Sequence, residues 1–196
     1  MKILAFVDVH GSLTALDKIK KKAKNADVLV CAGDISVFEE NIDFLMGRLD
    51  KIGKPVLMIH GNHEDSVFLR KICAGFKNIY FIHGKTWRKD DYLFIGYGGG
   101  GFSLTDPHFG KIGKRLIQKR KKGDKVILVT HAPPYKTRID LIIDQHCGNK
   151  TIRNFIVKYK PELAISGHLH ECAGKEDKIG KTRGINPGPY AKMITV

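Results

Sequence analysis

Short apolar runs alternate with longer amphipathic segments along most of this chain, and this alternation constrains the fold most strongly. The predicted β-strands are Lys2–Val7, Asp27–Cys31, Pro55–Ile59, Ile79–Ile82, Tyr92–Gly96, Lys125–Thr130 and Glu162–Ser166. The predicted helices are Ser12–Asn25, Glu39–Lys51, Asp65–Ala74, Gly110–Lys122 and Lys150–Tyr159. Strands that alternate with helices form sheets with a strong parallel component. The sequence therefore predicts an α/β fold.

The pattern changes after His170. Three short antiparallel strands are predicted there, because Gly and Pro turns separate them: Glu171–Asp177, Thr182–Asn186 and Lys192–Val196. No repeat, linker or low-complexity segment interrupts the 196 residues, a length that suits one domain with a substantial core. We therefore expect residues 1–196 to form a single domain.

The charge balance is basic: 34 Lys and Arg against 20 Asp and Glu give a net charge of +14. Much of the excess lies in two tracts, Lys18–Lys24 and Lys111–Lys125. These tracts can be solvated helix faces, or they can attract phosphate-bearing ligands and nucleic acid. Neither tract has interleaved aromatic residues to stack on bases, which favours solvated faces. Nucleic acid or a nucleotide remains an alternative partner.

The cysteines and the first apolar run indicate the compartment. The four cysteines stand singly, and the run Ile3–Val7 is too short for a signal-peptide core or a membrane span. Single cysteines without a signal peptide are typical of reduced, buried thiols. We expect a cytoplasmic protein that does not use a membrane. The sequence carries no indication of an oligomeric state.

Acidic, amide and imidazole side chains follow directly after five of the predicted strands. They lie in the pieces Asp8-Val9-His10, Gly33-Asp34, Gly61-Asn62-His63-Glu64, His131 and Gly167-His168-Leu169-His170. One such residue alone is commonly a cap or a turn residue. Open α/β sheets, however, bind ligands outside the carboxyl ends of their strands. The five pieces together therefore predict one site at one edge of the fold. In the last piece, His168 and His170 are expected to share one face of an extended chain.

The chemistry of these side chains indicates a metal centre. Imidazole, carboxylate and amide donors suit Mn, Fe, Ni, Co or Zn better than Ca or Mg. Two such ions about 3.5–4 Å apart lower the pKa of a shared water and stabilise both the attacking and the leaving oxygen of an in-line displacement. A bridging ligand needs two oxygens and a negative charge, which Asp34 offers. We expect two divalent metal ions, with Mn²⁺ as the first choice.

The five pieces resemble the signature of the calcineurin-like metallophosphoesterase superfamily, in particular its small prokaryotic phosphodiesterase-like members. That signature is Asp-x-His, Gly-Asp, Gly-Asn-His-Glu/Asp, a lone His and Gly-His-x-His, and every block occurs in this order between Asp8 and His170. The resemblance implies a four-layer α/β/β/α sandwich of two mixed β-sheets flanked by helices.

The resemblance also implies roles for individual residues. One metal would be held by Asp8, His10 and His170. The other would be held by Asn62, His131 and His168. Asp34 would bridge both. His63 would be no ligand but a general acid or charge stabiliser near the leaving-group oxygen.

We therefore expect hydrolysis of a phosphoester substrate by a hydroxide that bridges the two metals. A diester is slightly preferred over a monoester, because an alkoxide leaving group benefits from a proton donor such as His63. The alternatives are a phosphatase that acts on small phosphomonoesters and a non-catalytic metal-binding scaffold of the same fold. Scaffold members lose ligands, whereas this sequence retains all of them. Ile35-Ser36 stands where protein Ser/Thr phosphatases have Arg-Gly.

Four further features are candidates for a place in or beside the predicted site. Lys136, Arg138 and His146 are candidate substrate-binding residues, since they follow His131 or stand before a Cys-Gly pair. Gly96–Gly101 formally fits a Gly-x-Gly-x-x-Gly motif, but no helix opens directly after it, as a dinucleotide site requires. We interpret this segment as a Gly-rich turn that borders the site.

Overall fold

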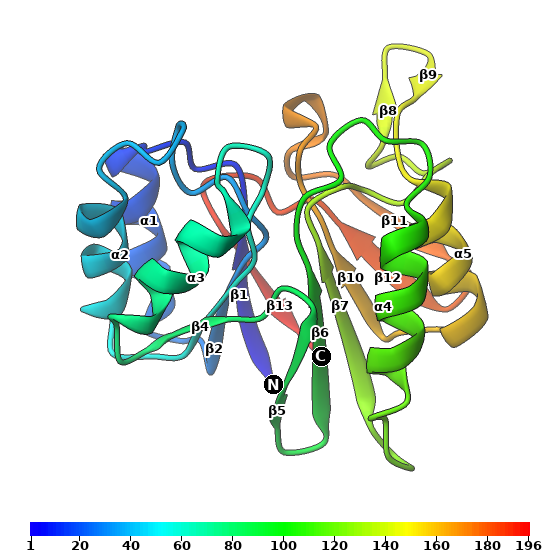
Figure 1. Ribbon diagram of the computed structural model, residues 1–196, viewed down its shortest axis with the longest axis horizontal. Coiled ribbons are helices and arrows are strands. Elements are labelled where there is room, and N and C mark those ends of the chain that lie inside the picture. The colour runs from blue at the N-terminus through cyan, green and yellow to red at the C-terminus, as the bar shows by residue number, and fades with distance from the viewer.

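Two mixed sheets pack face to face in the computed structural model, which describes residues 1–196, and helices cover both outer faces (Figure 1). The first sheet has the order β13-β1-β2-β3-β4. Its strands are β1 (Lys2–Phe6), β2 (Val28–Cys31), β3 (Val56–Met58), β4 (Ile79–Phe81) and β13 (Lys192–Thr195). The helices α1 (Leu13–Ala23), α2 (Ile42–Asp50) and α3 (Ser66–Ala74) cover it.

The second sheet has the order β11-β12-β10-β7-β6-β5. Its strands are β5 (Lys85–Lys89), β6 (Tyr92–Tyr97), β7 (Lys125–Thr130), β10 (Leu163–Ile165), β11 (Glu176–Ile179) and β12 (Thr182–Ile185). The helices α4 (Pro107–Ile117) and α5 (Lys150–Tyr159) cover it, and a small hairpin of β8 (Leu141–Ile142) and β9 (Gln145–His146) projects from one end. The predicted α/β/β/α sandwich is confirmed.

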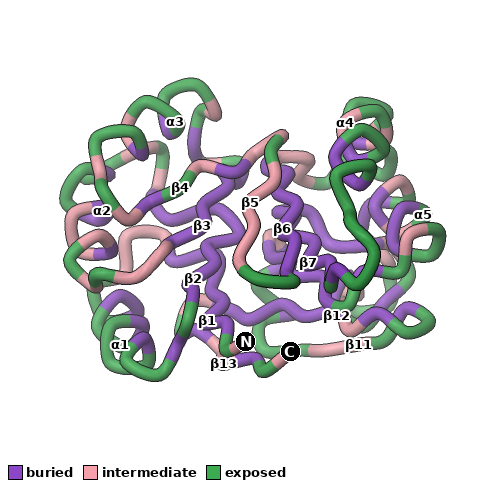
Figure 2. The backbone as a smooth tube through the Cα atoms, turned by 90° about the horizontal axis from the view of Figure 1, so that it is seen from below, coloured by how far each residue is buried: buried purple, intermediate pink, exposed green.

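Three apolar layers hold the sandwich together. Along β1, Leu4 and Phe6 join the cluster beneath α1, α2 and α3, whereas Ile3 and Ala5 join the cluster between the sheets. Successive side chains of a strand point to opposite faces, so a strand covered on both faces is apolar throughout. A third cluster packs the second sheet against α4 and α5. Figure 2 shows the central strands of both sheets buried, the edge strands β5 and β11 less so, and the outer helix faces exposed.

The basic tract of α1 follows the amphipathic pattern. Ser12 caps the helix by accepting a hydrogen bond from the backbone N–H of Ala15 at 3.2 Å. Leu16 and Ile19 are buried against the first sheet, while the lysines from Lys18 to Lys24 are exposed. This arrangement agrees with a solvated helix face. None of the helices is both long and apolar enough to cross a lipid bilayer.

The element boundaries differ from the prediction in several places. Helix α2 begins at Ile42 rather than Glu39, and helix α4 ends at Ile117 rather than Lys122. Helix α4 begins at Pro107 rather than Gly110, because Asp106 accepts a hydrogen bond from the N–H of Phe109 at 2.8 Å and Pro suits a first helical turn. Strand β5 has no apolar run and forms through its antiparallel pairing with β6. A 3₁₀ turn, η1 (His170–Cys172), stands where a strand was predicted from Glu171, and β11 begins only at Glu176.

Candidate metal centre

The parallel pairing of the strands brings the five polar pieces to one edge of the sandwich. In the first sheet β1, β2 and β3 run parallel, and they lead to Asp8, Asp34 and Asn62. In the second sheet β7 and β10 run parallel, and they lead to His131 and His168. Both sheets therefore contribute to the same site.

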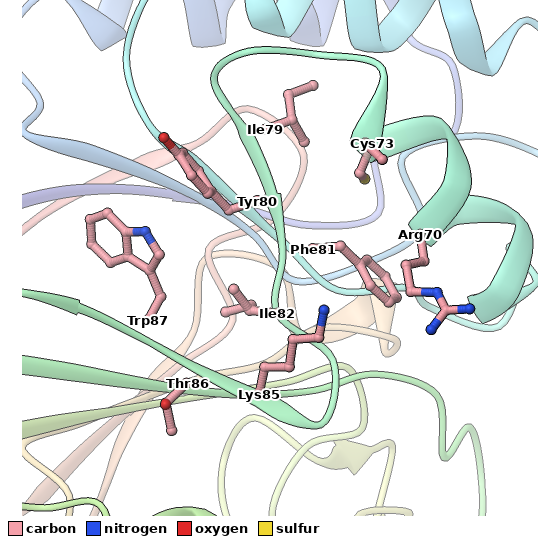
Figure 3. A pocket seen from close by; sticks show the side chains of 10 residues that line it. Arg70, Cys73, Ile79, Tyr80, Phe81, Ile82, Lys85, Thr86 and Trp87 are labelled. Carbon is pink, nitrogen blue, oxygen red and sulfur yellow. The ribbon is translucent and has the colours of Figure 1, made fainter.

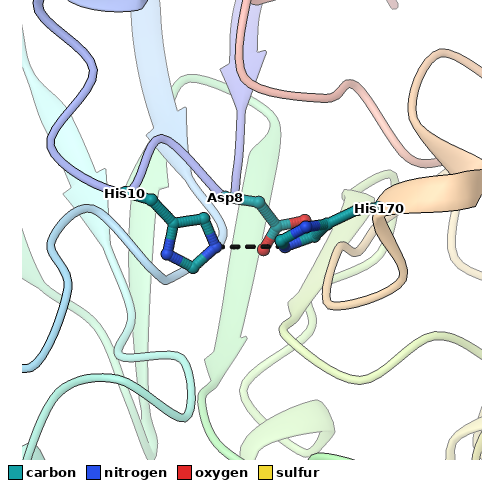
Figure 4. Close-up of side chains that lie close together, drawn as sticks. All are labelled: Asp8, His10 and His170. Atoms are coloured by element: carbon teal, nitrogen blue, oxygen red, sulfur yellow. Dashed lines mark hydrogen bonds between the residues drawn. The ribbon is translucent and has the colours of Figure 1, made fainter.

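Asp8, His10 and His170 form the first cluster (Figure 4). One ligand atom from each lies within 4.8 Å of those of the other two. The Nε2 atoms of His10 and His170 are 3.0 Å apart. Two imidazole nitrogens that converge on one point, beside a carboxylate, suit a shared cation.

Asn62, His131 and His168 form the second cluster. The amide Oδ1 of Asn62 lies 3.0 Å from Nε2 of His131 and 2.8 Å from Nδ1 of His168. The other ring nitrogen of His168, Nε2, is buried and has no hydrogen-bond partner. One carbonyl oxygen and two imidazoles thus meet at a single point, as metal ligands do.

Asp34 lies between the two clusters. Its Oδ2 is 3.4 Å from Nε2 of His131 and 3.9 Å from Nε2 of His10. Its Oδ1 accepts a hydrogen bond from the backbone N–H of His63 at 3.0 Å. Asp34 therefore reaches a ligand atom of each cluster.

The fully buried His131 is oriented for a metal. Its Nδ1 lies 2.9 Å from the carbonyl oxygen of Ala32. A carbonyl oxygen only accepts a hydrogen bond, so Nδ1 carries a hydrogen. Nε2, which faces Asp34 and Asn62, is the ring nitrogen left to bind a metal once any proton on it is lost. This is how a second hydrogen bond fixes the tautomer of a metal-binding histidine. The donor set and its orientation fit two divalent ions.

The electrostatics of the two carboxylates differ. Burial raises the pKa of Asp8 to about 6. Burial also acts on Asp34, but the hydrogen bond with His131 and the charge of that residue outweigh it and lower the pKa of Asp34 to about 2. Two acidic groups buried side by side are costly without a compensating positive charge. A pair of cations would supply that charge.

The backbone of the site is strained. Asp8, His10, Asp34 and His168 have φ values of 55°, 46°, 53° and 69°. Such values are uncommon for residues other than glycine and cluster at functional sites. The expectation that His168 and His170 share a face of an extended chain is wrong. His168 is left-handed and His170 begins η1, so the two rings turn to different clusters.

Similarity to known proteins decides the family. The family model for calcineurin-like phosphoesterases matches residues 1–172. The chain belongs to this family. It is also 31% identical to the uncharacterised protein MJ1162 of Methanocaldococcus jannaschii over 207 residues, which span 99% of this chain and 91% of that protein.

Solved structures share the calcineurin-like fold. TT1561 of Thermus thermophilus superposes with a TM-score of 0.77 at 19% identity, over 95% of this chain and 88% of that one. A dimetal phosphatase from Danio rerio gives 0.68 at 13% identity, over 94% and 86% of the two chains. At these identities the likeness concerns the fold. Family membership supports metal-dependent hydrolysis of phosphoesters as the chemistry of the site.

Glu64, the last residue of the Gly-Asn-His-Glu block, supports the site of this calcineurin-like protein, a role that the sequence did not assign to it. Glu64 is buried, and its Oε2 accepts hydrogen bonds from the backbone N–H groups of Asp34 at 3.1 Å and Gly61 at 3.0 Å. Its Oε1 accepts from both the N–H and the hydroxyl of Ser36, each at 3.0 Å. Glu64 therefore fixes the loop after β2 to the loop after β3.

His63 stands beside the candidate ligands. Its ring centroid is 4.8 Å from that of His10 and 4.6 Å from that of Phe38. Its Nδ1 is buried without a hydrogen-bond partner. Phe38 is 74% exposed although it is a large apolar residue, and its ring lies against that of His63. No sequence signal pointed to Phe38.

The Gly-rich turn borders the site, as expected. A Cβ on Gly98 would lie 2.3 Å from the carbonyl oxygen of His60, so the backbone passes too close for a side chain. The turn leads to Phe102, whose ring centroid is 4.4 Å from that of His168. Phe102 is 68% exposed and forms a second aromatic wall of the centre.

The three candidate substrate-binding residues make their hydrogen bonds away from the candidate metal ligands. Lys136 and Arg138 are on the surface side of the loop after β7, and their backbone N–H groups donate to carboxylates of Asp140 and Asp177. His146 pairs through Nδ1 with Asp140 at 2.8 Å. These contacts do not reach the candidate ligands, and a role in substrate binding stays a prediction for all three.

Proposed function

We propose that this protein is a dinuclear-metal-dependent phosphodiesterase. The two metals are assigned to the two clusters described above, with Asp34 bridging them and His63 as the general acid. The supporting observation is the position of Asp34, whose Oδ2 faces His131 at 3.4 Å and His10 at 3.9 Å. A carboxylate that lies between two groups of ligands is the arrangement that a metal pair needs.

The cofactor is proposed to be a pair of Mn²⁺ ions, with Fe, Ni, Co or Zn as alternatives. When bound, the ions would lower the pKa of a shared water and stabilise the charge that develops on the reacting oxygens. The protein's own contribution is orientation. A hydrogen bond to the Ala32 carbonyl orients His131, and a hydrogen bond to Glu64 fixes the backbone of Asp34. These donor groups are therefore in place before the ions bind.

The preference for a diester rests on His63. Hydrolysis of an alkyl diester releases one of its alcohols as an alkoxide, which needs a proton. A ring nitrogen of His63 lies within 4.8 Å of ligand atoms of His10 and Asp34. His63 would donate its proton to the leaving oxygen and regain one from solvent. A monoester with a good leaving group needs this donor less, and a phosphatase remains the second candidate.

Hydrolysis of bis-p-nitrophenyl phosphate in the presence of Mn²⁺ tests the proposal. Asp34→Asn should lose at least one bound ion and most of the activity, whereas Asp91→Asn, at the opposite end of β6, should behave like the parent. His63→Ala should keep both ions and lose about 10²–10³-fold in kcat for an alkyl diester. Metal-replete protein without turnover of any ester would contradict the proposal and support the scaffold alternative.

We also propose that the protein works in the cytoplasm. All four cysteines are free, and Cys31, Cys73 and Cys172 are buried. Burial raises the pKa values of the Cys31 and Cys73 thiols, the latter to about 12, so these thiols stay protonated. Secretion of the protein with a disulfide at Cys147 to a partner chain would contradict this placement.

A further inference from the structure

A cavity of about 420 Å³ opens directly beside the candidate ligand His10. It lies between the start of α1 and the segment from Val37 to Leu45 that leads into α2. A group attached to a phosphate bound beside His10 can therefore extend into this cavity. The cavity of about 370 Å³ between α3, β4 and β5 (Figure 3) contains none of the candidate ligands.

The walls of the cavity beside His10 are apolar and exposed. Leu13 on α1 is 48% exposed and Phe44 on α2 is 55% exposed, and the half-buried Val37 also lines the cavity. Large apolar side chains left open beside a catalytic centre are typical of a ligand site. An exposed phenyl ring in such a place offers a surface on which a flat ring can stack.

Two polar side chains complete the lining. Asn41 precedes α2 but makes no capping hydrogen bond with its side chain. Glu40 takes part in none of the ion pairs of the chain. Both side chains are therefore free to bind a ligand. A free carboxylate accepts hydrogen bonds from hydroxyl and amino groups, as an acidic residue does from ribose in dinucleotide sites.

The charge of the cavity excludes a second phosphate. The chain carries a net charge of +14, yet no Lys or Arg lines this cavity and its one acidic residue is Glu40. The nearby cation Arg48, 5.9 Å from the centroid of the Phe44 ring, is paired with Asp17. A phosphate or carboxylate would meet that negative charge without a cation to offset it. The occupant is therefore an uncharged group with a flat apolar ring and hydrogen-bond donors.

We propose that the cavity binds the nucleoside part of a nucleotide phosphoester, an inference that rests on the proposed function. The base stacks on Phe44 against Leu13, and ribose hydroxyl or base amino groups donate to Glu40. The phosphate remains at the candidate metal centre beside His10. Phe38 follows Val37 and contacts His63, so the same segment lines the cavity and lies against the general acid.

Phosphonates test this assignment, because their carbon–phosphorus bond is not an ester and is not hydrolysed. Calorimetry would compare methylphosphonate with the phosphonate analogue of adenosine 5′-monophosphate, both added to the manganese-loaded protein. The adenosine compound should bind at least tenfold more tightly. Phe44→Ala should weaken its binding about tenfold, as the loss of one stacked base does, and leave methylphosphonate unchanged. Glu40→Gln should weaken it severalfold.

Matched controls come from elsewhere on the surface. Phe68→Ala removes an exposed phenyl group from α3, and Glu162→Gln removes an exposed carboxylate; neither should change binding of either phosphonate. Equal affinity of the parent for the two phosphonates would overturn the cavity assignment. If bis-p-nitrophenyl phosphate is still hydrolysed in that case, the proposed function stands. Absence of hydrolysis of every ester contradicts the proposed function itself.

Discussion

Glu64 accepts a hydrogen bond from the backbone N–H of Asp34 at 3.1 Å, across 30 positions of the sequence. The same carboxylate holds Gly61 and Ser36, so it joins the loops that follow β2 and β3. The left-handed backbone of Asp34, with φ of 53°, is thus fixed by a buried acid that is not itself a candidate ligand. The position of the proposed bridging carboxylate depends on this contact.

Replacement of Glu64 by Gln should weaken both stability and metal binding. The amide nitrogen of Gln is a donor and would face backbone N–H groups that are donors too, which leaves buried groups unpaired. We expect a loss of about 2 kcal/mol in the free energy of unfolding, together with weaker Mn²⁺ binding. Urea denaturation and equilibrium dialysis measure the two effects. A variant with the stability and the Mn²⁺ affinity of the parent would show that Glu64 does not hold Asp34.

Gly61→Ala should disable the site by steric displacement. A Cβ at Gly61 would lie 1.9 Å from Oδ1 of Asp34 and 2.7 Å from its backbone nitrogen. The carboxylate must move, and a displacement of about 1 Å costs about 10²-fold in rate. The kcat for diester hydrolysis, compared between Gly61→Ala and the parent, measures this loss.

The matched control is Gly47→Ala in α2. A Cβ there would meet only Phe76, at 3.9 Å, which is ordinary contact. The change should leave activity intact and raise stability by up to about 1 kcal/mol, because Ala favours a helix over Gly. An active Gly61→Ala variant, or an inactive Gly47→Ala variant, would contradict the steric argument.

Glu176 should give a pH-dependent contribution to stability away from the site. Hydrogen bonds from Arg183 at 2.7 Å and 3.0 Å, together with Lys192, lower its pKa from 4.5 to about 2. Its stabilising effect is therefore complete above pH 4.5 and disappears as the pH falls through about 2. Because solvent screens this pair, Glu176→Gln should cost about 1 kcal/mol at pH 7.

Denaturation of the Glu176→Gln variant and the parent should be compared from pH 7 to pH 3. The difference in unfolding free energy should shrink as the pH falls below 4.5. Glu162→Gln, an exposed residue just before β10, should differ little from the parent at any pH. A difference for Glu176→Gln that stays constant with pH would contradict the ion-pair account.

Much of the fold follows from strand composition. Because both faces of β1 and β2 are covered, these strands are apolar throughout, and the polar residues that end each run mark the edge of the sheet. Strand β5 carried no such signal: it lies at an edge and consists of Lys85-Thr86-Trp87-Arg88-Lys89. Its pairing with β6 decides its structure, and pairing is not visible in local composition.

The candidate site was predictable as a set but not in its detail. The order of the five pieces along the chain indicated that Asp8, Asp34 and His131 meet. The left-handed conformation of His168 was not predictable, because this residue is not glycine and the surrounding structure imposes the conformation. Phe38 and Phe44 likewise look like ordinary core residues, and only the tertiary structure shows that they are exposed.

The central claim is that two ions share Asp34. Electron paramagnetic resonance of the protein titrated with Mn²⁺, together with equilibrium dialysis, tests it most directly. We predict two ions per chain with the spectrum of an exchange-coupled pair, and a single uncoupled ion in Asp34→Asn. One ion per chain in the parent, or two ions without coupling, would contradict the account.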